Sequence, residues 1–378
     1  MKSKTVSVAL EHRFFEYKGS VYTKLSFPYL YWKDYLSYFD EVKVIARVQS
    51  VNEIDSSYKR VDGDSVTVVS MPYYVGVKQF LFKFHKLLYS SFKAVKSSDS
   101  LLLRSGNISN LVWMFAMLLR VPYLREYPGN IREGIIGFGG EKLSIKILAY
   151  LLDYFAKFQS KYSKANSYVS EYCREIYSSN KPSYVFSSFN ADEITTLKND
   201  EFKDKSLNLI SVGRLEGEKG HRDLIEAISL IDFDVEVTII GDGSLKESLE
   251  NYSNELRVNA KFVGAVTDRD YLFELLASSD IFVIPSHTEG MPRSLLEAMA
   301  IGLPCLGTSV GGIPEVLDSN MLFSPNDPNS CARKISELIS NKNLIEMQSK
   351  RNIDFIRKNY SKKSLDEKKI KFWSELYR

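Results

Sequence analysis

Short apolar runs alternate with amphipathic stretches along the second half of the chain. The apolar runs predict buried strands, and the stretches between them, whose apolar positions recur every three or four residues, predict helices. The expected strands are 207–212, 235–240, 260–263, 281–284 and 304–307, and the expected helices are 222–231, 244–256, 270–277 and 292–300. Strands that are apolar throughout and separated by helices predict a parallel sheet that is covered on both faces.

The first half repeats this pattern less clearly. The expected strands are 5–10, 42–48, 66–69, 100–103 and 121–127, and the expected helices are 29–39, 78–92, 111–119 and 144–160. We therefore predict an α/β protein with two doubly wound, Rossmann-like domains that face each other across a cleft. In such folds the ligand site lies at the carboxyl ends of the strands.

A polar stretch separates the two halves. Residues 185–192, followed by the charged run from Lys198 to Lys205, predict a linker. We place the domains at 1–190 and 191–361. The tail, residues 362–378, is basic and amphipathic and carries Phe372, Trp373 and Leu376, which predicts a helix that returns towards the N-terminal domain.

Composition excludes several classes of protein. The chain is 44% hydrophobic and 26% charged, as in ordinary globular proteins rather than disordered ones. No apolar run reaches the ~20 residues of a spanning helix, and the first residues lack the pattern of a signal peptide. Three widely spaced cysteines fit neither a disulfide framework nor a zinc site. We expect a cytoplasmic protein.

The net charge of +3 conceals an asymmetry between the halves. Residues 1–190 carry 26 basic and 16 acidic residues, whereas residues 191–378 carry 24 and 31. The basic half predicts an anionic partner, either a membrane surface or a phosphorylated ligand; chance imbalance over a large surface is the alternative. No nucleic-acid recognition motif accompanies the basic half, so we expect no nucleic-acid partner.

Two cations lie on a glycine-containing loop after the strand that ends near Gly213. Arg214 and Lys219 could converge on one point, and Gly217 and Gly220 allow the backbone turns that an anion site needs. A guanidinium and an ammonium suit a diphosphate, whose charge grows as it leaves. The alternative is that both are solvated loop charges.

A second constellation spans residues 286–300. Pro292 opens a helix, whose first N–H groups, at Arg293, Ser294 and Leu295, can bind phosphate oxygens. Glu297, within the helix, can accept hydrogen bonds from a ribose diol, or it can be an ordinary helix-surface acid. Glu289, before the helix, could contact the group that hangs from the distal phosphate.

These stretches, with Gly241-Asp242-Gly243 and Gly311-Gly312-Ile313-Pro314-Glu315 in the expected order, carry a family resemblance. The chain resembles the retaining nucleotide-sugar glycosyltransferases of family 4, which have the GT-B fold. Glu289 and Glu297, which are separated by seven residues, match the signature of that family. The match covers roughly residues 207–318, whereas the first half resembles the family in architecture alone.

The resemblance implies a role for each motif residue. Arg214 and Lys219 would hold the diphosphate of a UDP- or GDP-sugar, Glu297 the ribose, and Glu289 the transferred sugar. Implied donor-binding residues are Gly290, Met291, Pro292, Ser294, Leu295, Gly213, Val266 and Gly19. Domain 1–190 would bind the acceptor and domain 191–361 the donor. Gly19 belongs to Lys18-Gly-Ser20, where the family has a glycine loop but this chain lacks the usual double glycine.

We expect no metal and no cofactor. Three Asp-x-Asp triplets, at 62–64, 232–234 and 268–270, could hold a divalent ion, but none follows an apolar strand. We interpret residues 62–64 as a turn, residues 232–234 as the segment that precedes a strand, and residues 268–270 as the start of a helix with an Asp cap. Charge stabilisation by two cations and a helix N-terminus replaces the metal, and retention by front-face attack is what the family implies.

Acceptor or sugar contacts are harder to locate. Candidates that follow expected strands are Arg104, Asn107, Glu126 and Asn130, with His287 inside a motif loop. Glu126 could instead pair with Arg125 or Arg132.

Residues 73–96 mix five lysines with Tyr, Phe and Leu. A basic amphipathic helix can lie on an anionic bilayer, which would place the enzyme at the inner face of the cytoplasmic membrane with a lipid-linked acceptor. The alternative is a helix that packs its aromatic face on the core.

The leading hypothesis is a retaining, metal-independent glycosyltransferase that builds surface polysaccharide from a nucleotide-sugar donor and a saccharide acceptor. The alternatives are a UDP-sugar epimerase of the same fold, which releases UDP without an acceptor, and a non-catalytic nucleotide-sugar-binding subunit or sensor.

Overall fold

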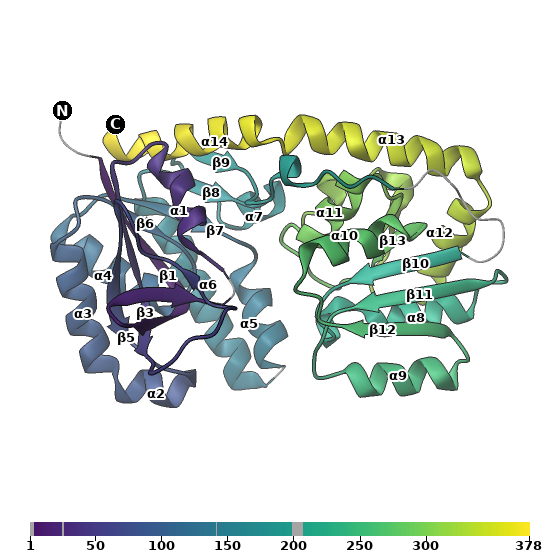
Figure 1. The fold of residues 1–378 in the computed structure, drawn as a ribbon, viewed down its shortest axis with the longest axis horizontal. Helices are drawn as coiled ribbons and strands as arrows, with labels where there is room; N and C mark the ends of the chain where they lie inside the picture. Colours follow the sequence, from purple (N-terminus) through teal and green to yellow (C-terminus); the bar gives the residue numbers. More distant parts are fainter. Residues whose placement is uncertain (1–3, 25, 141, 199–206) are drawn as a thin grey trace.

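A computed structural model describes residues 4–24, 26–140, 142–198 and 207–378. The chain forms two α/β domains that lie side by side, joined at the top of the view by the crossing segment and by the C-terminal helices (Figure 1). Of the charged run predicted as part of the linker, everything after Lys198 lies outside the described residues.

The N-terminal domain is built on a largely parallel sheet. Its strands are β1 (Thr5–Tyr17), β2 (Ser20–Thr23), β3 (Glu41–Ser50), β4 (Lys59–Arg60), β5 (Val66–Pro72), β6 (Leu101–Leu103), β7 (Tyr123–Tyr127), β8 (Asn166–Tyr168) and β9 (Ser183–Val185). The parallel order is β5-β3-β1-β6-β7-β8-β9. β2 pairs antiparallel with the last residues of β1, and β4 pairs antiparallel with β2. The first strand is therefore longer than the six residues predicted.

Helices cover both faces of this sheet. They are α1 (Tyr29–Leu36), α2 (Gly76–Phe82), α3 (Phe84–Lys96), α4 (Asn107–Leu119), α5 (Ile131–Gly139), α6 (Leu143–Tyr162) and α7 (Glu171–Ile176). The prediction of one helix over 78–92 was wrong, because the chain leaves helical geometry at Lys83, which ends α2 and precedes α3.

The C-terminal domain has a wholly parallel sheet in the order β12-β11-β10-β13-β14-β15. Its strands are β10 (Leu207–Val212), β11 (Val235–Ile240), β12 (Asn259–Gly264), β13 (Ile281–Ile284), β14 (Cys305–Thr308) and β15 (Leu322–Phe323). Its helices are α8 (His221–Ser229), α9 (Lys246–Glu255), α10 (Arg269–Ala277), α11 (Arg293–Ile301), α12 (Pro328–Ile339) and α13 (Lys342–Asn359). The predicted two-domain α/β architecture is confirmed.

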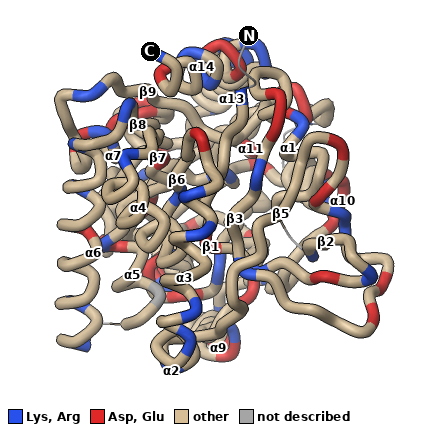
Figure 2. Tube along the Cα trace, turned by 90° about the vertical axis from the view of Figure 1, so that its left-hand side faces the viewer, with Lys and Arg blue, Asp and Glu red and all other residues tan. Residues whose placement is uncertain are grey.

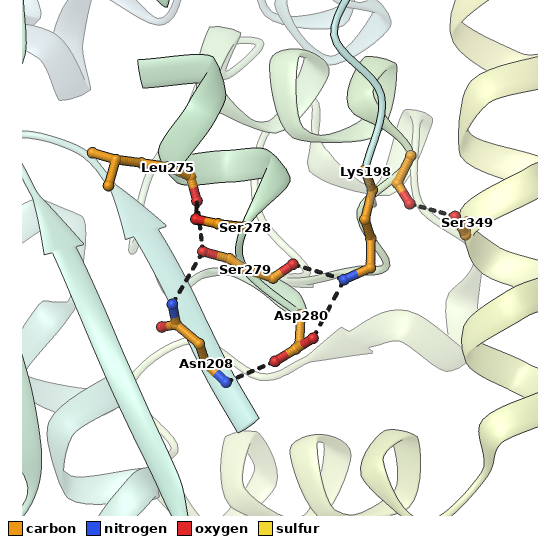
Figure 3. Close-up of polar contacts among 8 residues, drawn as sticks. Lys198, Asn208, Leu275, Ser278, Ser279, Asp280 and Ser349 are labelled. Carbon is orange, nitrogen blue, oxygen red and sulfur yellow. Dashed lines mark hydrogen bonds and ion pairs between the residues drawn. The ribbon is translucent and has the colours of Figure 1, made fainter. Parts of the chain in front are cut away.

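The chain crosses between the domains twice. Phe189 already packs in the C-terminal core, and the chain is then fastened to the end of α10. There the ammonium of Lys198 donates to Ser279 O at 2.7 Å and pairs with Asp280 Oδ1 at 3.4 Å (Figure 3). The second crossing is α14 (Lys362–Ser374), which returns to the N-terminal core as expected.

We predict that Trp373→Ala destabilises the protein by about 3–5 kcal/mol. Trp373 is 2% exposed and packs on Tyr35 and Phe39, with ring centroids 4.8 and 5.5 Å away, so truncation leaves a cavity between α14 and the N-terminal domain. Urea unfolding measures the change. Ile370→Ala, on the same helix but 39% exposed, is the matched control; an equal loss in both variants would contradict the docking role of Trp373.

Candidate functional site

A cavity of about 170 Å³ lies between the two domains. The N-terminal domain contributes the start and the first turns of α5, and the C-terminal domain contributes the loops that follow β10 and β13. The lining residues are Gly129, Asn130, Glu133, Gly134, Gly137, Arg214, Glu218, Lys219, Thr288, Glu289 and Gly290. Because β10 and β13 are neighbours at which the strand order reverses, the cavity lies at a topological switch point, where open α/β sheets bind ligands.

The C-terminal wall of the cavity contains two ion pairs. Lys219 ends a 3₁₀ turn, and its ammonium lies 2.6 Å from Glu289 Oε1, which also accepts a hydrogen bond from Ser286 Oγ at 2.8 Å. Arg214 pairs with Glu218 at 2.6 Å, and its side chain is half exposed. The sequence-predicted trio of Arg214, Lys219 and Glu289 therefore lines one cavity, with each cation against a carboxylate.

A second glycine loop fixes the backbone at Glu289. Gly311 has φ +56°, and a Cβ there would lie 1.8 Å from Glu289 O. Its neighbour Gly312 donates its N–H to Gly290 O at 2.9 Å. The Gly311-Gly312 pair is thus required by the close approach of two loops rather than by contact with the cavity.

The N-terminal wall touches the C-terminal one directly. Thr288 Oγ1 donates a hydrogen bond to Glu133 on α5, and the Glu133 carboxylate also accepts one from Tyr172 at 3.1 Å. Asn130 caps α5, accepting from Glu133 N at 3.3 Å. A Cβ on Gly290 would lie 3.1 Å from Gly129 Cα, so the two backbones nearly touch beside the cavity.

Another interdomain contact lies on the far side of the Gly311 loop. The carboxylate of Glu315 accepts hydrogen bonds from Glu171 N at 2.9 Å and Tyr172 N at 2.8 Å, at the start of α7. Burial raises the pKa of Glu315, and these two N–H donors oppose that rise. The two walls are therefore held together by hydrogen bonds from separate loops.

Glu297, on α11, is not among the residues that line the cavity. It is 3% exposed, and its Oε1 pairs at 2.8 Å with Arg293, one turn earlier, and with Arg269 of α10. The interpretation of Glu297 as an ordinary surface acid is wrong, because the carboxylate is buried and holds two arginines.

The N-terminus of α11 lies beside this carboxylate. Pro292 takes the N-cap position, so α11 starts at Arg293, one residue later than expected, and the helical ladder begins with Leu296 N donating to Pro292 O at 3.3 Å. The N–H groups of residues 293–295 precede that ladder. Ser294 Oγ donates to Val212 O at 3.1 Å, and Leu295 is fully buried, so only their backbone N–H groups remain suited to an anion.

The remaining expected donor residues lie around these loops but outside the cavity lining. Gly213 donates its N–H to Ile240 O at 2.9 Å, and Met291 and Val266 pack on the C-terminal core. Gly19 differs from expectation: with Lys18 it makes the tight turn between β1 and β2, with φ values of +79° for Gly19 and +48° for Lys18. The chain thus has a hairpin where a glycine loop was expected.

Three of the expected acceptor candidates lie away from the cavity. Arg104 Nε pairs with Glu126 Oε2 at 3.1 Å, and Arg104 Nη1 donates to Tyr31 Oη at 2.9 Å. The carboxylate of Glu126 thus pairs with Arg104, whereas Arg125 donates to the backbone oxygen of Glu126 at 3.2 Å. Asn107 begins α4. Of the N-terminal candidates, the cavity includes Asn130 alone among its described lining residues.

His287, expected as a ligand contact, is engaged in holding its own loop. Its Nε2 lies 2.7 Å from Asp223 Oδ2, and its backbone N–H donates to Glu218 O at 2.8 Å. These contacts tie the loop after β13, which carries Glu289, to the segment after β10, which carries Arg214 and Lys219.

His221, at the start of α8, is 3% exposed, and burial with the nearby charge of Lys219 lowers its pKa from 6.5 to about 4. Folding therefore favours the neutral form of the His221 imidazole. We predict that stability is full above pH 6.5 and falls as the pH drops towards 4, by at most about 1.4 kcal/mol per pH unit from this group.

Urea unfolding between pH 4 and 7 checks this prediction. His12, whose pKa burial also lowers to about 4, contributes in the same direction, so His221→Gln is expected to flatten the profile only in part. His85→Gln, at an exposed position of α3, is the control. A profile in His221→Gln as steep as that of the unchanged chain would contradict the prediction.

Two of the three Asp-x-Asp triplets accept hydrogen bonds from backbone N–H groups. Asp62 accepts from Val21 N at 2.9 Å, and Asp268 caps α10 by accepting from Asp270 N and Tyr271 N. Within the residues that the structure describes, no three His, Cys, Asp or Glu side chains are grouped so that they could hold a metal ion.

Comparison with known proteins adds a family match. Residues 192–355 match the model of glycosyl transferases group 1. Protein CapJ of Staphylococcus aureus is 26% identical over 94% of this chain and 90% of its own length. Two shorter matches follow. An amylovoran biosynthesis glycosyltransferase of Erwinia amylovora is matched over 31% of its length. A GDP-mannose-dependent mannosyltransferase of Corynebacterium glutamicum, which acts on a phosphatidylinositol monomannoside, is matched over 42% of its length.

Solved structures share the whole architecture. Sucrose-phosphate synthase of Thermosynechococcus elongatus superposes with a TM-score of 0.74 at 14% identity, covering 99% of both chains. HepE of Anabaena, solved in complex with UDP, gives 0.69 at 13% identity over 98% of this chain and 99% of its own. The fold is that of the GT-B glycosyltransferases, and within it residues 192–355 match the model of glycosyl transferases group 1.

Proposed function

We propose that the chain transfers a glycosyl unit, with retention of configuration, from a UDP- or GDP-sugar to a saccharide acceptor carried on a lipid, in surface polysaccharide synthesis. The observation that carries the proposal is the interdomain cavity in which Arg214, Lys219 and Glu289 meet the wall formed by α5. The UDP complex of HepE, which has the same fold, supports a nucleotide donor.

The two cations and the start of α11 would receive the donor diphosphate. Lys219 and Arg214 already face carboxylates, so a diphosphate oxygen would replace or join Glu289 and Glu218 as their partner. Once the donor is bound, the charge that develops on the leaving diphosphate would be stabilised by groups already in place, so the chemical step itself would need no further reorganisation.

Glu297 would accept hydrogen bonds from the ribose hydroxyls. Both of its ion pairs use Oε1, and they hold the carboxylate in one orientation. Glu289, held by Lys219 and Ser286, would contact the transferred sugar. These roles come from the family resemblance, and the positions of the side chains are compatible with them.

Transfer would need no protein nucleophile. The acceptor hydroxyl would attack the anomeric carbon on the face from which the diphosphate leaves: the new C–O bond forms, the bond to the phosphate oxygen breaks, and the acceptor proton passes to the departing diphosphate. No metal would be required, because Arg214, Lys219 and the α11 N-terminus supply the compensating charge.

The cavity is too small to hold a nucleotide sugar without a movement of its walls. At about 170 Å³ it is smaller than the roughly 300–1,000 Å³ of typical small-molecule sites. Donor binding would therefore separate the walls, and the contacts that must loosen first are those of Glu133 with Thr288 and of Glu315 with the start of α7.

Product analysis tests the proposal. The full chain is incubated with UDP- and GDP-sugars, with and without lipid extract as acceptor, and the anomeric configuration of the product is read by NMR. An acceptor-dependent product of retained configuration, formed in EDTA, is expected. Inversion of configuration would contradict the retaining mechanism, and dependence on a divalent ion would contradict the metal-independent one. Release of free sugar and UDP without acceptor would contradict transfer to an acceptor.

We predict that Glu297→Ala raises the Kd for the donor about 10- to 100-fold, because hydrogen bonds to a charged acceptor contribute about 1.5–3 kcal/mol. Arg269 and Arg293, which lose their partner, are 44% and 54% exposed and can be solvated. Calorimetric titration measures the change. Glu274→Ala, at an exposed position of α10, is the control, and unchanged donor affinity in Glu297→Ala would refute the ribose role.

A further inference from the structure

The N-terminal domain carries most of the large hydrophobic side chains that the fold leaves in solvent. Of 26 such side chains among the described residues, 18 lie between residues 75 and 162: six on or beside α2 and α3, four on α4 and eight on α6. Clustering of this kind, in place of single scattered residues, marks an interaction surface.

These helices form one continuous layer. Trp113 of α4 packs on Phe155 of α6 with ring centroids 4.7 Å apart, and Phe115 of α4 packs on Phe92 of α3 at 5.6 Å. Figure 2, which views the molecule from the left-hand side of Figure 1, draws α2, α3, α4 and α6 in the left and lower part of the trace. We call the outward side of α2, α3, α4 and α6 the helical face.

The exposed side chains of α6 form a stripe along its length. Successive members are three or four residues apart, which keeps them on one side of a helix. They are Leu143 (74% exposed), Ile147 (53%), Leu151 (63%), Tyr154 (71%), Phe158 (37%) and Tyr162 (51%). A helix of 20 residues is about 30 Å long, so the stripe extends across the whole domain.

The charge on this face has one sign. Segment 75–98, which includes α2 and α3, contains five lysines and no acidic residue, and α4 contains no acidic residue either. The single acid of α6, Asp153, is buried, pairs with Lys157 at 2.9 Å and accepts from Tyr177 at 2.8 Å. The helical face therefore presents apolar and aromatic groups rimmed by lysines.

We propose that the helical face docks the protein on the surface of an anionic lipid bilayer. Apolar and aromatic side chains with flanking lysines match the two attractions that hold an interfacial helix, burial among acyl chains and attraction to anionic headgroups. A second copy docking through the same face would bring like charges together, which disfavours that occupant.

The docking is peripheral and keeps the cavity close to the lipid. Among the described residues, no helix is long and apolar enough to span a membrane. Helix α5 lines the cavity through Glu133, Gly134 and Gly137, and only three residues separate its end from the start of α6. An acceptor anchored in the bilayer would thus reach the cavity past α5; this consequence rests on the proposed function, whereas the docking does not.

Co-sedimentation of the full chain with lipid vesicles tests the proposal. Binding is expected to phosphatidylcholine vesicles that contain phosphatidylglycerol, and to be weaker to phosphatidylcholine alone. Leu151→Glu/Tyr154→Glu places two charges in the stripe and is expected to weaken binding about 10-fold or more. Leu230→Glu/Met347→Glu, at C-terminal-domain positions 51% and 59% exposed, is the matched control and is expected to bind normally.

Neutralising lysines tests the electrostatic part. Lys78→Gln/Lys86→Gln is expected to weaken binding to anionic vesicles about 5-fold for each lysine removed, since each contributes about 1 kcal/mol near such a surface. Absence of vesicle binding, equal binding by the stripe variant and its control, or a dimer in sedimentation velocity that the stripe variant abolishes would overturn the proposal.

Donor binding, measured in parallel by thermal shift, keeps this proposal separate from the proposed function. The stripe variant is expected to bind the donor as the unchanged chain does, because its substitutions lie outside the cavity. Vesicle binding without donor binding would overturn the enzymatic proposal alone, and donor binding without vesicle binding would overturn the docking alone.

Discussion

Replacing Lys219 by alanine is expected to lower kcat about 10²- to 10³-fold, the loss typical when a preorganised group that stabilises developing charge is removed. Its ammonium lies 2.6 Å from Glu289 in the cavity, where the proposed diphosphate would leave. Glu289 keeps Ser286 as a partner but loses its counter-charge. Steady-state kinetics with the donor identified by binding measures the effect.

Two further variants isolate the role of this charge. Lys219→Arg keeps a cation and is expected to recover part of the activity, whereas Lys246→Ala removes a lysine of α9 whose side chain is 41% exposed and is expected to change kcat little. Equal activity of Lys219→Ala and Lys246→Ala would show that Lys219 does not act on the leaving group.

Gly311→Ala is expected to lower activity about 10²-fold or more, although the residue does not line the cavity. The added methyl group would lie 1.8 Å from Glu289 O, so the Glu289 backbone must move by about an ångström or more. A displacement of that size at a reacting centre can cost about 10²-fold in rate. Kinetics and thermal unfolding of the same preparation measure both consequences.

Gly76→Ala separates the clash from backbone strain. Gly76 also has a left-handed φ, +69°, but nothing lies within 4 Å of a Cβ there. Both variants incur the left-handed penalty, about 1 kcal/mol, whereas only Gly311→Ala displaces a site loop. Comparable activity in the two variants would contradict the role of the Gly311-Gly312 loop in positioning Glu289.

The C-terminal domain could be predicted well because its strands are buried on both faces. The ranges 207–212, 235–240 and 281–284 match β10, β11 and β13 residue for residue. Apolar runs of that kind end where the strand leaves the core, so burial itself marks the boundary.

The N-terminal domain was predicted less well because tertiary contacts decide its boundaries. β1 continues to Tyr17 through the polar residues 11–13, since β3 pairs alongside it as far as Ser50. The short strands β8 and β9 hold three residues each, too few for a periodic signal.

The site divides in the same way. Arg214, Lys219 and Glu289 could be found because each follows a strand of the C-terminal sheet in a recognisable motif. Glu133 and Thr288 were missed because their contact joins residues 155 positions apart across the cleft, which no local pattern encodes. The only local signal was Asn130 followed three residues later by Glu133, which indicates a helix start rather than a site.

Thermal unfolding with a panel of UDP-, GDP- and ADP-sugars, in EDTA, tests the central claim most directly. A donor at about 100 times its Kd should add about 2.7 kcal/mol to the folded state. We expect one nucleotide class to raise the Tm of the chain, and Glu297→Ala to remove about half or more of that rise at the same concentration. If no nucleotide sugar raises the Tm, with lipid vesicles present or absent, the loops around Lys219 and Glu289 are not a donor site.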